Sequence, residues 1–352
     1  MSINPYKSLP ESAFWGSAVA ERHVYDLDLA SAAPISSDDR IATAGSCFAQ
    51  HIGHHLRQRG ANYVDLEPTP AGISAVDAAR FGYGVFSCRY GNLYTTRQLR
   101  QLLEEALGRR TPRDAVWEKD GRYYDALRPS VDPVGHDTSE DVERLRRLHL
   151  AHVRKLLTAM DVFVFTLGLT EAWTSRVDGT VYPSAPGVIA GHYDPSVHAF
   201  VNFRYPDVMA DLRAAWTILR SYNSKLRMIL TVSPVALKAT AAGDHVLVAN
   251  TQSKSTLRAV AGDLAATEPE ISYFPSYELI VSHPMRAMFF EPDLRSVNPG
   301  GVDYVMSKFF GSSRAGGRSL ARSLAASKAN GREGLPSTNF DLICDEEAND
   351  PG

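Results

Sequence analysis

The stretch Arg40-Ile-Ala-Thr-Ala-Gly-Ser-Cys-Phe-Ala-Gln50 runs from a short apolar segment through Gly45-Ser46 into a helix-like segment. A short apolar run that ends at a glycine predicts a buried β-strand, and the residues that follow it predict a helix. A serine on such a turn lies at the C-terminal edge of a sheet, beside the free N–H groups of a helix N-terminus. Two interpretations of Ser46 follow. It is either a nucleophile, whose oxyanion those N–H groups would stabilise, or a helix N-cap, for which serine is a preferred residue.

The rest of the chain alternates between strand-like and helix-like segments. The alternation predicts a mainly parallel sheet with helices on both faces, a three-layer α/β/α fold. In such a fold the ligand site lies beyond the C-terminal ends of the strands. The expected strands are 40–44, 161–167, 227–232 and 271–274, and the expected helices are 138–160, 207–222 and 250–266.

Two segments predict antiparallel additions to this fold. Residues 117–124 contain Asp120-Gly121 and residues 173–182 contain Asp178-Gly179, and Asp-Gly between β-rich residues is typical of hairpin turns. Residues 183–205 are rich in Pro, Gly, Ser and His, and we expect them to fold over the sheet edge as a substrate lid. The lid histidines, His192 and His198, lack metal-ligand spacing and are interpreted as ordinary loop residues.

We expect three parts along the chain. Residues 1–35 form an N-terminal arm packed on the core, residues 36–311 form the domain, and residues 312–352 form a mobile tail rich in Ser, Arg, Ala and Gly with an acidic end.

Composition excludes several classes of function. The 352 residues are 44% hydrophobic and 22% charged, and 37 basic against 40 acidic residues give a net charge of −3. With no long basic run, nucleic-acid binding has no electrostatic support. No apolar stretch approaches a membrane span and no secretory h-region is present, so we expect a cytoplasmic protein. The three cysteines lack metal-ligand spacing, so we expect no metal site. We expect no cofactor either, because catalysis by a serine nucleophile needs none.

Several strings together resemble those of the GSCFA family, within the SGNH (GDSL-type) hydrolase superfamily. The resemblance covers most of residues 4–311 and includes the string that gives the family its name, Gly45-Ser46-Cys47-Phe48-Ala49. The other strings are Asn4-Pro5-Tyr6, Gly91-Asn92-Leu93-Tyr94-Thr95, the segment 165–173, Thr231-Val232-Ser233-Pro234-Val235, Ser253-Lys254 and the segment 273–278.

The resemblance implies a flavodoxin-like parallel sheet with Ser46 as the nucleophile. It also implies oxyanion donors from the N–H of Ser46, from Gly91 with Asn92 beside it, and from Gly168-Leu169-Thr170. Thr170 stands where the superfamily has asparagine, and a poorly placed hydroxyl there would cost about 2–4 kcal/mol of transition-state stabilisation. Thr170 as an ordinary hydrogen-bonded loop residue stays open as the alternative.

The superfamily's Asp-x-x-His motif is incomplete here, because the chain reads Asp293-Leu294-Arg295-Ser296. Ser296 stands in the histidine position and cannot act as the base. Three explanations stay open: a substitution made to trap a bound form, a natural departure, or a different alignment of this block. His283 is an alternative base or a surface loop residue, and the histidines that follow Ser46 on its helix are expected on a flank directed away from the turn; these are His51, His54 and His55.

Other residues near the expected site have two interpretations each. Cys47 is either a thiol nucleophile near a helix start or a small buried residue. Lys254 either contacts an acidic substrate or is a solvated lysine beside a helix-start serine, Ser253. Tyr90, Tyr94 and Trp173 either stack on a sugar ring or pack in the core.

The sequence thus predicts a serine-dependent ester hydrolase or O-acyltransferase that forms an acyl-Ser46 intermediate, with activity impaired if Ser296 replaces the base. Its expected partner is a small ester, in particular an acylated sugar. The alternative is a non-catalytic carbohydrate or acyl-ligand binding protein on the same scaffold. Hydrolysis and transfer are not distinguished, since water or an acceptor hydroxyl can take the acyl group from the same intermediate.

Overall fold

The computed structural model describes residues 4–29, 35–311 and 344–349. Its centre is a four-stranded parallel sheet in the order β1-β4-β8-β9. The strands are β1 (Ile41–Gly45), β4 (Val162–Leu167), β8 (Arg227–Val232) and β9 (Ile271–Tyr273). All four strands predicted from the apolar runs are confirmed, as is the mainly parallel sheet.

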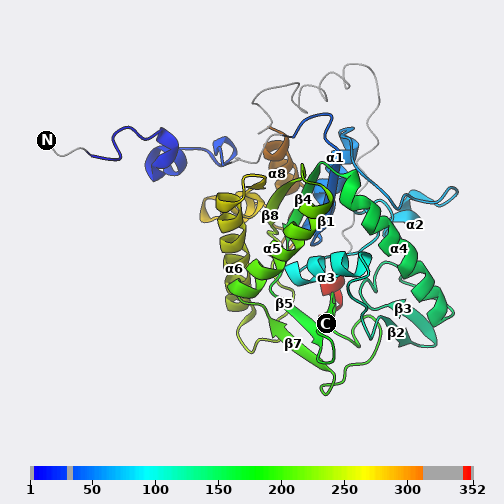
Figure 1. Cartoon of the computed structure of the whole chain (residues 1–352). Coiled ribbons are helices and arrows are strands. Elements are labelled where there is room, and N and C mark those ends of the chain that lie inside the picture. Colours follow the sequence, from blue (N-terminus) through cyan, green and yellow to red (C-terminus); the bar gives the residue numbers. More distant parts are fainter. Residues whose placement is uncertain (1–3, 30–34, 312–343, 350–352) are drawn as a thin grey trace.

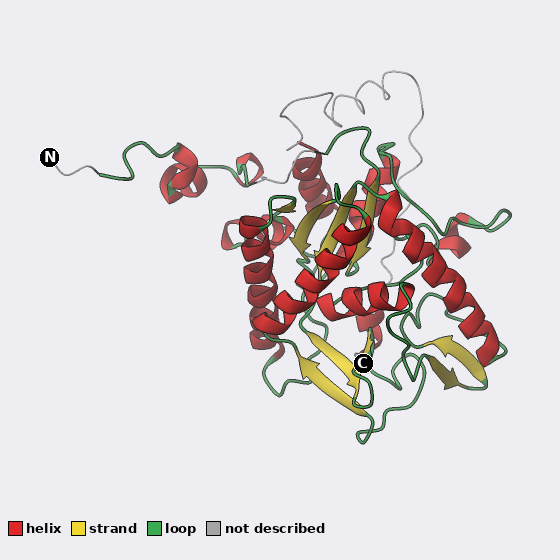
Figure 2. Cartoon of the chain, viewed as in Figure 1, coloured by secondary structure: helices red, strands yellow, loops and turns green. Residues whose placement is uncertain are grey.

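Helices cover both faces of this sheet, so the domain has three layers (Figures 1 and 2). On one face pack α3 (Thr96–Ala106), α4 (Ser139–Ala159), α5 (Tyr205–Tyr222) and α6 (Val246–Thr267). On the other face pack α1 (Phe48–Gln58), α7 (Ser276–Val281) and α8 (Pro299–Gly311). The short α2 (Ala75–Arg80) lies between α1 and α3 in the chain.

Local sequence signals explain where these helices begin. The Thr138 side chain accepts a hydrogen bond from the Asp141 N–H, and this N-cap starts α4 where the sequence predicted it. Thr95 and Gln98 form a full capping box at the start of α3. Because α3 starts directly after Tyr94, this cap also fixes the loop that precedes it.

The predicted hairpins form two small antiparallel sheets below the main sheet (Figure 2). Strands β2 (Val116–Lys119) and β3 (Arg122–Asp125) pair across the first Asp-Gly turn, and β5 (Glu171–Ser175) and β6 (Val181–Tyr182) pair across the second. The expected lid contains a strand that the sequence did not predict, β7 (His198–Asn202), which pairs with β5.

The N-terminal segment touches the domain at a few places. The 3₁₀ helix η3 (Val24–Asp26) contacts α8 through the Tyr304 hydroxyl, which donates to the Val24 carbonyl at 2.8 Å. The preceding η1 (Glu11–Ala13) and η2 (Gly16–Ala20) bury none of their residues and project from the body (Figure 1). Trp15 stacks on His283, which belongs to η4 (His283–Met285).

Part of the predicted tail, residues 312–343 and 350–352, lies outside the described residues. Between these ranges, Cys344 and the 3₁₀ helix η5 (Asp345–Asn349) lie beside α3 (Figure 1), with Asp345 and Glu346 buried. The sequence predicts a mobile tail over these six residues, Cys344–Asn349, whereas in the structure they pack into the domain.

Candidate active site

The turn that carries Ser46 depends on glycine. Gly45 has φ of 133°, and a Cβ atom at this position would lie 2.3 Å from the Thr166 carbonyl oxygen. Only glycine fits such a backbone. The turn is fixed to the neighbouring strand because the Ser46 N–H donates to the same Thr166 oxygen at 3.1 Å.

The Ser46 side chain is buried without a hydrogen bond. Its exposure is 2%, and its Oγ has no hydrogen-bond partner among the described residues. The N-cap position of α1 is Cys47, so the interpretation of Ser46 as a helix cap is wrong. A buried hydroxyl with no partner costs free energy and requires an explanation, which a catalytic role would supply.

Gly168, at the end of β4, makes room for Ser46. A Cβ on Gly168 would lie 2.9 Å from the Ser46 Cβ and 3.1 Å from the Tyr94 carbonyl oxygen. The Gly168 N–H donates to that Tyr94 oxygen at 3.0 Å, and the Leu93 N–H donates to the Gly45 oxygen at 2.9 Å. The ends of β1 and β4 and the loop before α3 therefore meet around Ser46.

Lys254 also reaches Gly168, from α6. Its Nζ donates to the Gly168 carbonyl at 2.8 Å, and the side chain is 1% exposed. Burial lowers the pKa of Lys254 to about 8, while the charge of Glu346 opposes this shift. The preferred interpretation of a solvated lysine beside a helix start is wrong, because Ser253 and Lys254 lie in the middle of α6 and face the core.

Two donors beside this turn hold the carboxylate of Asp345. The Asn92 Nδ2 donates to Asp345 Oδ2 at 2.8 Å, and the Tyr94 hydroxyl donates to the same oxygen at 3.3 Å. Gln50 donates to the Asn92 Oδ1 at 3.0 Å and so fixes which way the amide points. Burial raises the pKa of Asp345, against hydrogen bonds from the side chains of Ser130, Asn92 and Tyr94.

The next acidic residue, Glu346, meets a buried arginine. Arg295 Nη2 lies 3.4 Å from Glu346 Oε2, and the Arg295 Nε donates to the Ala236 carbonyl at 3.0 Å. The Arg295 side chain is 12% exposed. Burial, and then the neighbouring Cys344, raise the pKa of Glu346 to about 7, against the effect of Arg295 and Lys254.

Cys47 contacts Cys344 of the same C-terminal segment. A hydrogen bond to Cys344, together with burial, raises the pKa of the Cys47 thiol well above its usual value. The same bond, helped by Arg295, lowers the pKa of Cys344 to about 6. Because the thiolate is the reactive form, these shifts argue against Cys47 as a nucleophile.

The Asp-x-x-His equivalents, Asp293 and Ser296, hydrogen-bond to each other and not to Ser46. The Ser296 hydroxyl donates to Asp293 Oδ2 at 2.6 Å, and the two residues satisfy each other in a surface loop. Burial alone would raise the pKa of Asp293, but the bonds from Ser296 and the backbone lower it. The exposed His283 stacks on Trp15, with ring centroids 5.3 Å apart, and does not pair with Ser46.

Most of the expected oxyanion donors are engaged elsewhere. The Thr170 hydroxyl donates to Asn202 Oδ1 at 2.7 Å and its N–H donates to the Ser253 hydroxyl at 3.0 Å. The Thr170 assignment as an oxyanion donor is therefore corrected to that of a hydrogen-bonded loop residue. The Ser46 and Gly168 N–H groups bond to carbonyls, as described above, so neither supplies a donor in this arrangement.

Of the two neighbours expected to supply an oxyanion donor, Gly91 and Asn92, the side chain of Asn92 is better placed than the backbone of Gly91. Gly91 lies against Val131 and Arg128 and has φ of 70°. This positive φ favours glycine, so the residue has a conformational role in the turn. Asn92 is the member of the pair whose amide lies beside Tyr94 and donates to a carboxylate.

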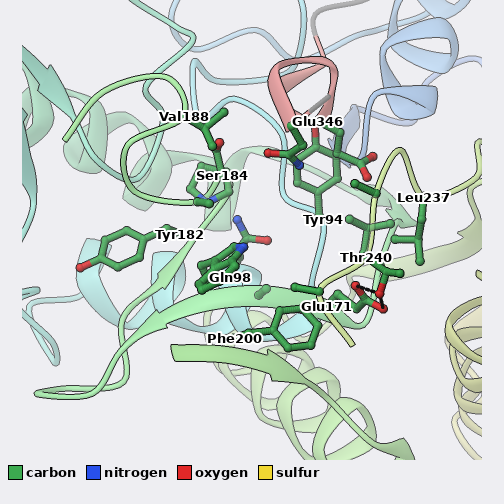
Figure 3. A pocket seen from close by; sticks show the side chains of 18 residues that line it. Tyr94, Gln98, Glu171, Tyr182, Ser184, Val188, Phe200, Leu237, Thr240 and Glu346 are labelled. Atoms are coloured by element: carbon green, nitrogen blue, oxygen red, sulfur yellow. Dashed lines mark hydrogen bonds between the residues drawn. The ribbon is translucent and has the colours of Figure 1, made fainter. Parts of the chain in front are cut away.

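A cavity of about 230 Å³ adjoins this group of residues (Figure 3). Tyr94 and Leu169 connect it with the Ser46 turn, and Trp173 and Phe200 of the small sheet line its floor. The predicted lid contributes Pro183, Ser184 and Val188, and Glu346 closes one side. Of the aromatic residues expected to contact substrate, Tyr94 and Trp173 line the cavity, while Tyr90 is buried against Phe86.

Neither a metal cluster nor a membrane span is found in the described ranges. No group of three or more His, Cys, Asp or Glu side chains there is placed to hold a metal ion. Among the same residues, no helix is both long enough and apolar enough to cross a bilayer. His198 instead accepts a hydrogen bond from the Asp194 N–H at 3.1 Å.

Sequence reasoning missed Arg295 and the C-terminal segment. Arg295 lies between Asp293 and Ser296, the two positions that the superfamily pattern names, and the pattern gives no role to the residue between them. The acidic run Asp345-Glu346-Glu347, a possible counterpart for buried cations, was the available signal.

Comparison with known proteins bears on the family alone. No curated protein matches the chain. The model of the GSCFA family matches residues 40–309, which span β1 to α8 and therefore the whole central sheet and the Ser46 turn. The chain belongs to the GSCFA family.

Proposed function

We propose that this protein is a serine-dependent carboxylic ester hydrolase or O-acyltransferase of the SGNH type, with Ser46 as the nucleophile. The observation that carries the proposal is the buried, unpartnered Ser46 hydroxyl on a glycine-dependent turn at the C-terminal edge of a parallel sheet. Open α/β sheets place their ligand sites at this edge. A parallel bridge between Ile41 and Tyr63 adds a rudimentary strand outside β1, and the resulting 2-1-3-4-5 order is that of flavodoxin-like folds.

Lys254 is the base in this proposal, in place of the missing histidine. Burial makes a lysine lose its proton more readily, which is how lysines become general bases near neutral pH. Lys254 and Ser46 meet at the two sides of Gly168, one through its carbonyl and one through its Cα. We expect the Lys254 Nζ and the Ser46 Oγ to lie closer together in the complex with substrate than in this unliganded structure, as is common for catalytic hydrogen bonds.

The reaction then proceeds in two acyl transfers. The Ser46 oxygen forms a bond with the acyl carbon while its proton moves to the neutral Lys254 amine. The tetrahedral intermediate collapses with cleavage of the ester C–O bond, and the leaving alcohol takes the proton from Lys254. Water or an acceptor hydroxyl next loses a proton to Lys254 and attacks the acyl-serine, which releases Ser46 and the acid or the new ester.

Asn92 Nδ2 and the Tyr94 hydroxyl are the oxyanion donors in this proposal. Both already donate to a carboxylate oxygen, that of Asp345, and a carboxylate oxygen resembles the oxyanion in charge. Removal of one such donor in serine hydrolases lowers kcat by about 10²–10³. The adjoining cavity, lined by Trp173 and Phe200, accommodates the remainder of the substrate.

The test is hydrolysis of p-nitrophenyl acetate by the full chain and by single variants. We expect Ser46→Ala and Lys254→Met each to reduce kcat by at least about 10³, since a nucleophile and its base act as one unit. Lys254→Arg should be equally inactive because an arginine does not lose its proton.

The matched control is Ser296→His, which restores the superfamily residue at a position whose hydroxyl donates to Asp293 and not to Ser46. The proposal predicts an unchanged rate for this variant. A rise of tenfold or more would return the base to position 296, and an unchanged rate in Ser46→Ala would exclude Ser46 as the nucleophile.

A further inference from the structure

Six residues from the C-terminal end of the chain occupy the site described above. Cys344 contacts Cys47, Asp345 accepts from Asn92 and Tyr94, and Glu346 lies against Arg295. The two contacts of Asp345 join residues 253 and 251 positions apart in the chain. The segment is therefore an internal ligand of the Ser46 site, and its chemistry indicates what the site binds.

The buried cation of this site has its carboxylate partners in that segment alone. Among the described residues, every salt bridge of Arg295 goes to Glu346 or Glu347. Nearby, Lys238 Nζ pairs with Glu347 at 3.3 Å. The Arg295 guanidinium is 12% exposed and is held in place by its bond to the Ala236 carbonyl. If the segment departed, this guanidinium would keep no salt bridge to any described residue. Such a group is a preformed receptor for an anion.

The two acidic side chains have different surroundings. Asp345 meets neutral donors, Asn92 and Tyr94, next to the Ser46 turn, whereas Glu346 meets Arg295 and also lines the cavity (Figure 3). The first position suits a reacting acyl group, and the second suits a fixed negative charge on the same substrate.

We propose that the Ser46 site takes acyl substrates that carry a carboxylate, which Arg295 binds, and that Asp345 and Glu346 of the chain itself occupy these positions and compete with the substrate. The proposal rests on the proposed function for the reacting position, but the carboxylate site can be tested without turnover. Displacement of the segment opens the site, and it also removes the Glu346 charge that favours the protonated form of Lys254.

The experiment uses the full chain carrying Asp345→Ala and Glu346→Ala together, because these substitutions remove the two buried carboxylates of the segment and leave the rest of the protein in place. Its substrates are two p-nitrophenyl esters of equal acyl length, the neutral pentanoate and the glutarate monoester with its free carboxylate. Binding of glutarate itself is measured by calorimetry. Glu143→Ala, which removes an exposed carboxylate of α4 outside the site, is the matched control.

We expect the double variant to hydrolyse both esters about ten- to a hundredfold faster than the unchanged chain, because a site occupied by its own segment is available only in that fraction of molecules. The glutarate monoester should be preferred about tenfold to a hundredfold, mainly through a lower KM, as for a charge-assisted hydrogen bond. Adding Arg295→Met should abolish this preference, while Arg295→Lys should retain part of it. Glu143→Ala should change each rate less than about threefold.

Equal rates for the two esters, or a preference that survives Arg295→Met, would overturn the inference while leaving the proposed function intact. Glutarate binding that depends on Arg295, without turnover of either ester, would support the carboxylate site and refute the esterase function. Absence of both binding and preference would overturn the inference.

Discussion

Two buried polar clusters in this molecule differ in how their charges are satisfied. The first lies among α3, α4 and β3, where Arg146 forms two bonds to Glu105 and two to Asp125, and Arg128 Nε donates to Asp125 at 2.7 Å. The second surrounds Ser46, whose hydroxyl has no hydrogen-bond partner among the described residues.

The difference distinguishes structural burial from functional burial. In the Arg146 cluster every partner belongs to the folded core, so the cluster fixes how α3, α4 and β3 pack together. In the Ser46 site, the carboxylates belong to Asp345 and Glu346, which lie in a C-terminal segment outside the central sheet and the helices that cover it. Buried polar groups are normally satisfied, and a site that lacks partners of its own is arranged for something that binds there.

The largest expected effect is on stability, from the Arg146 cluster. Arg146→Met should lower the free energy of unfolding by about 3–5 kcal/mol, because it leaves Glu105 and Asp125 buried with their main cation gone. Urea unfolding followed by circular dichroism measures the change. The exposed neighbour Arg147→Met is the control and should change stability by less than about 0.5 kcal/mol. An equal effect of the two substitutions would show that the cluster does not stabilise the core.

The next effect is on the pH dependence of the Ser46 site. If Lys254 acts as the base, kcat/KM should rise with pH and level off above the pKa of Lys254, which is about 8 in the unchanged chain. The groups that face Lys254 are Glu346, Cys47, Arg295 and Cys344. Because the Glu346 charge raises this pKa, Glu346→Ala should move the midpoint to lower pH, by an amount on the order of one unit. A midpoint that stays in place, or moves to higher pH, would argue against Lys254 as the base.

The smallest expected effect is also on stability, but it is neutral or stabilising, in contrast to that of Arg146→Met. Ser46→Ala should leave the free energy of unfolding unchanged or raise it by up to about 1 kcal/mol, because it removes a buried hydroxyl that has no partner. The same urea titration measures this change. A loss of more than about 1 kcal/mol would mean that the Ser46 hydroxyl stabilises the fold and would weaken its assignment to catalysis.

The fold could be predicted from the sequence to a large extent, because local patterns determine most of its parts. Apolar runs gave the four sheet strands, and Thr138 gave the start of α4 through its N-cap bond. The strand β7 was missed because its residues, His198–Asn202, form a strand only by pairing with β5. A strand that forms only through such a tertiary contact has no periodic pattern of its own in the sequence, so it cannot be predicted from local residues.

The site could be predicted only in part. Ser46 and Asn92 lie in sequence motifs that resemble those of the GSCFA family, so their place at the site could be predicted from the sequence. Their roles remain predictions. Lys254 was read as solvated because a lysine in a helix usually is, and only the packing of α6 shows it to be buried. Arg295 and Cys344–Asn349 join the site through contacts between distant parts of the chain, with Cys47, Asn92 and Tyr94 among the partners of the segment, and no local pattern encodes such contacts.

The central claim is that Ser46 is a nucleophile whose site the chain's own C-terminal segment occupies. Its most direct test is labelling with a fluorophosphonate, followed by intact-protein mass spectrometry and peptide mapping, for the unchanged chain and for the variant with Asp345→Ala and Glu346→Ala. We predict a single adduct on Ser46 that forms at least about tenfold faster in the variant and is absent after Ser46→Ala. No adduct on Ser46 in either protein, or equal labelling rates in the two, would contradict the account.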